Sequence, residues 1–260
     1  MKIKVIFFLT LTFIISWIAW GIIAILTHLD LAQFGDTTVM IGFVIGGTSP
    51  AISAFVTKRK FDKEQFHDFL KQHIKFKVNI GWYFWLILMP YILTGIPWFL
   101  NFLSTGKTEP IFNQPLYMVL AFLPMMIIGG GLEEIGWRGL LLPELLKKQS
   151  KFFASLIVGV IWVIWHFPLW FVKDSPQADL NLGLFAITVI SMSYLFTILW
   201  ETRSIGMCIL FHAFFNSYGT TMNTPSINPW LDNIIKLILC ISIFFLFRLA
   251  DKRNSINQKE

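Results

Sequence analysis

Residues 5–26, VIFFLTLTFIISWIAWGIIAIL, contain no charged side chain. A helix rises about 1.5 Å per residue, so this run can cross the roughly 30 Å hydrocarbon core of a bilayer. Lys2 and Lys4 precede it, as in a secretory signal, but the run is too long and lacks a small-x-small cleavage site. We therefore predict a retained first membrane-spanning helix.

The rest of the chain has the same character, with 55% hydrophobic and 14% charged residues and a mean hydropathy of +0.66. Soluble domains carry roughly a quarter charged residues. The composition therefore predicts an all-α, polytopic membrane helical bundle with about eight spans. The candidate spans are residues 4–26, 37–57, 81–101, 116–143, 152–172, 182–200, 204–222 and 230–249.

Charge distribution predicts the orientation of this bundle. With both termini cytoplasmic, every Lys and Arg except Lys107, Lys173 and Lys236 falls on the cytoplasmic side, as the positive-inside rule requires. The net charge of +6 is thus explained by orientation, and we do not expect nucleic-acid binding. No linker divides residues 1–260, so we expect one transmembrane domain, with a cytoplasmic amphipathic connector over residues 58–79 whose apolar positions approximate helical spacing. These positions are Phe61, Phe66, Phe69, Leu70 and Ile74.

Ionisable side chains inside a membrane are costly and mark candidate functional sites. In GGGLEEIGWRG, residues 129–139, Glu134 and Arg138 are four apart, which predicts an ion pair on one helix face. Glu133 lies about 100° further round the helix and has no partner there, so its carboxylate is the candidate for chemistry. The preceding glycines permit a kink or a close approach by another helix.

Two later spans carry further polar groups. His212 and Asn216 are four apart and share a helix face, whereas His166 precedes Pro168, which loosens its helix. Glu133, His166 and His212 lie about 15, 21 and 12 Å from the expected cytoplasmic ends of their spans, so their depths overlap. A carboxylate, two imidazoles and an amide converging there are suited to activating water. Cys208 and Cys240 lie in apolar runs and read as buried thiols.

The three segments EEIGWRG, WVIWH and HAFFN resemble the motifs EExxxR, FxxxH and HxxxN of the CPBP family, the CAAX protease and bacteriocin-processing (Abi) intramembrane proteases. The resemblance covers about residues 115–222, the expected catalytic core. Trp162 stands where the family has Phe, from which we expect an altered pocket wall and intact chemistry. The resemblance implies an intramembrane endopeptidase in which Glu133 is the general base for a water held by His166, His212 and Asn216. Glu134, Arg138 and Trp162 are expected to support this site.

Several alternatives remain open from sequence. Glu133, His166 and His212 are also a set that could hold zinc, although HExxH is absent and we favour a metal-independent site. The resemblance also allows a non-catalytic protein, such as a bacteriocin self-immunity factor or a complex subunit, and intramembrane Glu and His allow a transporter. The expected partners are membrane lipids and a lipidated or membrane-associated peptide from the cytoplasmic face or inner leaflet. The expected location is a bacterial cell membrane.

Overall fold

The computed structural model describes residues 2–73, 75–107, 110–222, 226 and 228–257, and within them the chain is helical with one isolated β-bridge. The predicted all-α membrane bundle is confirmed. The long helices are α1 (Lys2–His28), α2 (Thr37–Phe61), α4 (Ile80–Thr105), α8 (Lys151–His166), α9 (Leu182–Trp200) and α11 (Pro229–Asn257). The shorter ones are α3 (Phe66–His73), α5 (Met118–Ile128), α6 (Glu134–Gly136), α7 (Leu142–Leu146) and α10 (Ile205–Thr221).

Six helices in the described part of the chain are long and apolar enough to cross a membrane, and a seventh span results if α5 and residues 131–146 count as one bent span. The remaining expected span is α10, which has 17 residues. Most of its side chains are buried between α5, α9 and α4, which explains why this helix can carry polar residues. By contrast, α1, α4 and α11 expose rows of large apolar side chains, as lipid-facing helices do.

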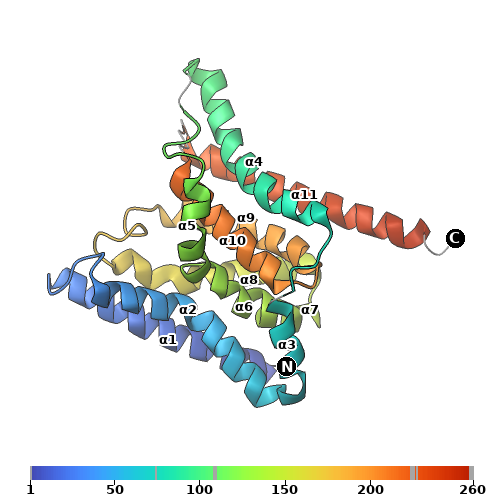
Figure 1. The fold of residues 1–260 in the computed structure, drawn as a ribbon, viewed down its shortest axis with the longest axis horizontal. Helices are drawn as coiled ribbons and strands as arrows, with labels where there is room; N and C mark the ends of the chain where they lie inside the picture. The colour runs from blue at the N-terminus through green and yellow to red at the C-terminus, as the bar shows by residue number, and fades with distance from the viewer. Residues whose placement is uncertain (1, 74, 108–109, 223–225, 227, 258–260) are drawn as a thin grey trace.

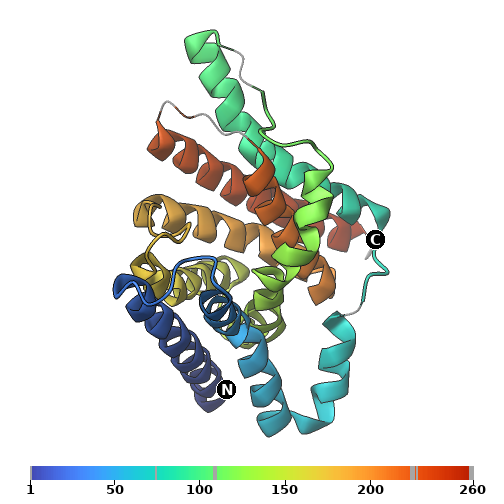
Figure 2. The ribbon, with the colours of Figure 1, turned by 60° about the vertical axis from the view of Figure 1, so that its left-hand side comes forward.

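The first two helices form an antiparallel pair along one side of the molecule (Figures 1 and 2), with α4 on the opposite side. Gly42 and Gly46, one turn apart on α2, allow the close approach. A methyl group at Gly46 would lie 2.1 Å from Nε1 of Trp20, and one at Gly42 would lie 2.4 Å from a methyl of Ile23. Small residues four apart are a common basis for helix packing in membranes.

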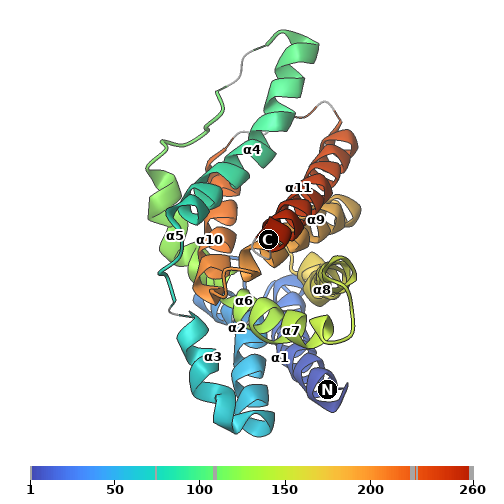
Figure 3. The same ribbon diagram turned by 90° about the vertical axis from the view of Figure 1, so that its right-hand side faces the viewer.

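The short helix α6 lies between α2 and α10 in the centre of the bundle (Figure 3). Gly136 packs directly against the α2 backbone, because an added methyl group would lie 2.6 Å from the carbonyl oxygen of Pro50. This contact fixes the depth of the two acidic residues that precede Gly136.

Ion pairs connect the charged ends of several helices at one end of the bundle. We call this end the basic end. Lys4 at the start of α1 bonds both Asp62, after α2, and Glu144 on α7. Burial works to raise the pKa of Asp62, but hydrogen bonds from Lys4 and Lys58 outweigh it and hold that pKa below its ordinary value. At the same end, Glu201 after α9 pairs with Lys151 of α8 and Arg248 of α11.

The connector is less helical than expected. After α2 ends at Phe61, a short 3₁₀ turn, Lys63–Gln65, leads into α3, and residues 75–79 carry no helix. Phe69 is buried, with its ring centroid 5.8 Å from that of Phe55 on α2, so α3 is anchored to the bundle by an apolar face. Ile74, also expected on that face, lies outside the described residues.

Candidate active site

The acidic motif lies at a break in the polypeptide. The helix α5 ends at Ile128, and after the turn at Gly129 and Gly130 the chain continues as the 3₁₀ helix η2 (Gly131–Glu133) and α6. The two halves are bent by 42°. A π-helical turn, η3 (Trp137–Leu141), follows before α7. Irregular backbone at membrane depth is tolerated where protein encloses it, and π-turns are frequent at functional sites.

The predicted ion pair forms in the fully buried core. Nη1 of Arg138 lies 3.0 Å from Oε2 of Glu134, and both side chains are 0% exposed. Nη2 of Arg138 donates to Oγ of Ser193 on α9, at 3.2 Å. The guanidinium also lies over the rings of Phe196 and Trp162, 4.2 and 4.9 Å from their centroids. Arg138 therefore compensates the buried charge of Glu134 and ties it to α9.

His212 contacts this pair. Its Nδ1 lies 2.9 Å from Oε1 of Glu134, the oxygen that also faces Arg138 at 3.3 Å. A carboxylate can only accept here, so Nδ1 carries a hydrogen, and in that tautomer Nε2 keeps its lone pair. The sequence predicted Glu134 as a supporting residue. The structure gives that support a definite form, because Glu134 fixes the tautomer and orientation of His212.

Glu133 is buried at 4% exposure, and it has hydrogen-bond partners that the sequence did not predict. Its Oε2 accepts a hydrogen bond from the indole Nε1 of Trp162 at 2.6 Å, and Nε1 of Trp137 is 3.4 Å away. The sequence predicts that Glu133 has no partner in its own helix. This prediction is wrong, because the indole N–H of Trp137, four residues later, donates to Glu133. Oε1 accepts no hydrogen bond from the described residues. One oxygen is therefore held by neutral donors, and the other has no hydrogen-bond partner among the described residues.

His166 closes α8, and the 3₁₀ turn η4 (Phe167–Phe171), which contains Pro168, follows directly. Its Nδ1 donates to the carbonyl of Trp162 at 2.8 Å, which again leaves Nε2 as the free acceptor. The ring stacks on Trp20 of α1, with 6.2 Å between centroids. Trp162 thereby contacts Glu133 through its indole N–H and His166 through its carbonyl, and its ring centroid lies 5.3 Å from that of His212.

Asn216 and His212 converge on the backbone of Gly130. A methyl group at Gly130 would lie 2.7 Å from Nδ2 of Asn216 and 2.8 Å from Nε2 of His212. The two nitrogens are therefore close neighbours at the turn that precedes Glu133. Only glycine leaves room beside these two nitrogens. We call the pair the polar corner; it offers one donor, the Asn216 amide, and one acceptor, His212 Nε2.

The predicted metal ligands do not fit a metal centre in this arrangement. Among the described residues, no three His, Cys, Asp or Glu side chains converge as metal ligands would. Glu133 faces indole donors, and His212 is joined to Glu134. No step below therefore passes through a metal.

The contributors that the sequence did not predict differ in whether a sequence signal exists for them. Trp137 lies four residues after Glu133, a spacing that could have suggested the contact. Ser193 and Trp20 come from helices outside the three motifs, and only the tertiary packing places them beside Arg138 and His166.

Two comparisons with known proteins bear on this arrangement. Residues 115–218 match the family described as type II CAAX prenyl endopeptidase Rce1-like. The chain is 27% identical to CAAX prenyl protease 2 of Methanococcus maripaludis over 224 residues, which cover 79% of this chain and 80% of the relative. Both findings confirm the resemblance to the CPBP family, and the matched segment contains all the residues predicted to form the site.

Proposed function

We propose that this integral, multi-pass membrane protein is an intramembrane endopeptidase that hydrolyses a peptide bond of a membrane-anchored substrate. The chain is similar to CAAX prenyl proteases. One observation supports the proposal most directly. The buried carboxylate of Glu133, with one oxygen that has no partner among the described residues, adjoins the polar corner formed by His212 and Asn216, in a turn enclosed by protein.

In the proposed reaction, Oε1 of Glu133 takes a proton from a water molecule whose oxygen attacks the carbonyl carbon. The water's second hydrogen is donated to Nε2 of either His212 or His166, which orients the water oxygen toward the carbonyl carbon. Asn216 Nδ2 donates to the oxyanion of the tetrahedral intermediate. When the C–N bond breaks, the proton on Glu133 passes to the leaving amine. Glu134 and Arg138 act through His212, whose orientation they fix.

The substrate class follows from the relatives. Their names specify prenyl proteases, so we propose a lipidated peptide or protein whose anchor lies in the leaflet at the basic end of the bundle. The exposed apolar faces of α1, α4 and α11 contact membrane lipids in this proposal. We propose that the protein lies in a bacterial cell membrane. The charge distribution predicts that the basic end faces the cytoplasm.

The direct test uses the purified full-length protein in liposomes and a peptide with a farnesylated cysteine three residues from its C-terminus. Mass spectrometry of the products should show one new C-terminus at or near the modified cysteine. A comparison of membrane proteomes from cells with the wild-type protein and with Glu133→Ala extends the test to natural substrates. Intact peptide together with identical proteomes would contradict the proposal.

Gly130→Ala should reduce kcat by at least about 100-fold, because the added methyl group occupies the corner between Asn216 and His212. Initial rates on the farnesylated peptide measure the effect. Gly219→Ala, on the same helix as His212 but with open space around the new methyl group, is the matched control and should retain activity. Equal rates for the two variants would show that the corner is not used.

Trp162→Phe should lower kcat by about tenfold with little change in KM, because the indole hydrogen bond to Glu133 is lost while the ring and the backbone contact to His166 remain. Phe is the residue of the family motif, so the variant should fold. A change confined to KM would assign Trp162 to substrate binding and contradict the positioning role.

A further inference from the structure

A cavity of about 220 Å³ lies at the basic end between the start of α1 and the end of α7, and we call it the α1–α7 cavity. Figures 1 and 3 show the N-terminal end of α1 beside α7. The walls of the cavity are apolar, with Val5 and Ile6 from α1 and Leu145 from α7. Ile6 is 62% exposed and belongs to the row of apolar side chains on the outer face of α1. The cavity therefore borders the surface that α1 presents to lipid.

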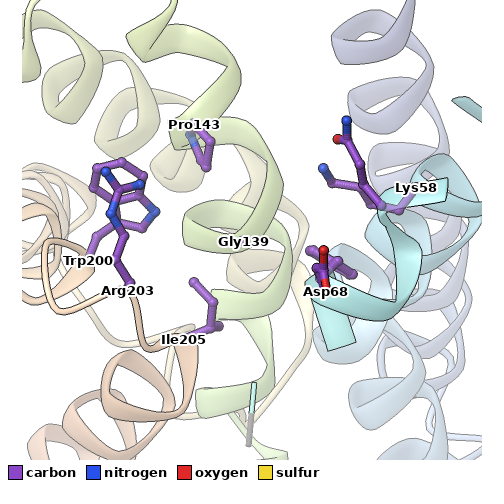
Figure 4. Close-up of a pocket in the computed structure, with 9 residues that line it drawn as sticks. Lys58, Asp68, Gly139, Pro143, Trp200, Arg203 and Ile205 are labelled. Atoms are coloured by element: carbon purple, nitrogen blue, oxygen red, sulfur yellow. The ribbon is translucent and has the colours of Figure 1, made fainter. Parts of the chain in front are cut away.

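Two lysines that line this cavity have no counter-charge among the described residues. Lys2 begins α1 and Lys148 follows the end of α7, and neither forms an ion pair with a described carboxylate. Both side chains are exposed. Lys58, in the cavity shown in Figure 4, differs, because Asp62 pairs with it at 3.0 Å and Asp68 lines the same cavity. The α1–α7 cavity thus offers two uncompensated positive charges to an anion.

Glu144, which also lines the cavity, is a carboxylate with one occupied and one unoccupied oxygen. Its Oε1 accepts hydrogen bonds from Lys4 and from Lys147, the latter at 2.8 Å, so its negative charge is already compensated. Its Oε2 is buried and accepts no hydrogen bond from the described residues. A buried acceptor without a partner is costly. A ligand that carries a hydroxyl group next to its negative charge would satisfy this oxygen.

From these charges and this unpartnered oxygen we propose that the α1–α7 cavity binds the headgroup of phosphatidylglycerol, an anionic phospholipid. The phosphate pairs with Lys2 and Lys148, and a glycerol hydroxyl donates to Oε2 of Glu144. An acyl chain lies along the exposed side chain of Ile6. A soluble anion would gain nothing from the apolar walls, and a zwitterionic headgroup would bring an ammonium group beside two lysines. This site does not depend on the proposed peptidase function.

The test titrates the full-length protein in neutral detergent with short-chain phosphatidylglycerol and follows the unfolding temperature, which rises as the lipid binds and so reports its affinity. The double variant Lys2→Gln, Lys148→Gln should bind about 25-fold more weakly, because each lysine near an anionic headgroup is worth about fivefold in affinity. The matched control is Lys63→Gln, Lys71→Gln, which removes two exposed lysines outside this cavity and should bind as the wild type does. Phosphatidylcholine with the same chains should leave the unfolding temperature unchanged.

Several results would overturn this assignment. The first is an unfolding temperature of the wild type that phosphatidylglycerol does not change. Equal affinities of the two double variants would show a general attraction to the basic end instead of a site in this cavity. Equal stabilisation of the wild type by phosphatidylethanolamine would exclude an anionic headgroup, and equal affinity for glycerol phosphate, which lacks the acyl chains, would replace the lipid by a soluble anion. The comparisons of ligands use the wild type alone, so they decide the proposal even if a variant is unstable.

Discussion

Glu133→Gln should reduce the cleavage rate by about 1,000-fold, within the range found when a general base is lost. The amide has nearly the shape of the carboxylate and can still accept the hydrogen bond from Trp162 through its oxygen, so the surroundings should persist. What it cannot do is take a proton from water at neutral pH. Initial rates on the farnesylated peptide, measured in liposomes, give the magnitude.

The control for this variant is its folding. The Glu133→Gln protein should elute as the wild type does in detergent and unfold at nearly the same temperature, because no buried ion pair of Glu133 is broken. Retained activity would remove Glu133 from the chemistry and direct attention to Glu134 and His212 as a carboxylate–imidazole pair. Loss of folding would show that Glu133 is structural, and substitution of Asn216, which is half-buried, would then have to test the site.

The sequence was sufficient for the features that depend on solvent and on helix period. Long uncharged runs predict spans because backbone groups in a bilayer must bond internally. The Glu134–Arg138 pair follows from a four-residue spacing, and the structure contains it at 3.0 Å. Helix rise alone predicts a shared depth for Glu133, His166 and His212. In the structure Trp162 contacts all three side chains.

The sequence could not predict which carboxylate meets which partner. Glu133 and Glu134 are adjacent, so their depths are almost equal, and the choice depends on the rotation of a short segment after the bend at Gly129 and Gly130. That rotation directs Glu134 to His212 and Glu133 to Trp162. The rotation of this segment is constrained by the π-turn that follows Gly136 and by the close contact of Gly136 with Pro50. Neither feature has a local sequence signal. For the same reason the sequence predicts Trp162 only as part of a pocket wall, whereas in the structure its indole N–H donates to Glu133.

Arg138→Met should lower stability by about 3–5 kcal/mol, the cost of leaving a buried charge without its partner. Glu134 is 0% exposed, and in this variant only His212 would face its carboxylate. Met fills much of the volume of the arginine side chain, whereas the contacts of the guanidinium with the rings of Trp162 and Phe196 are lost with the ion pair, so the loss is mainly electrostatic. Thermal and denaturant unfolding in detergent measure it. Arg59→Met, at an exposed position, should change little.

The double variant Glu134→Gln, Arg138→Met separates structure from catalysis. Removing both charges leaves no uncompensated ion, so much of the stability lost in Arg138→Met should return. Activity should not return, because the amide oxygen introduced by Glu134→Gln holds His212 less firmly than a carboxylate anchored by Arg138. A double variant as unstable as Arg138→Met would show that Arg138 acts through Ser193 and the aromatic rings instead of through Glu134. A stable and active double variant would show that the pair is dispensable for orienting His212.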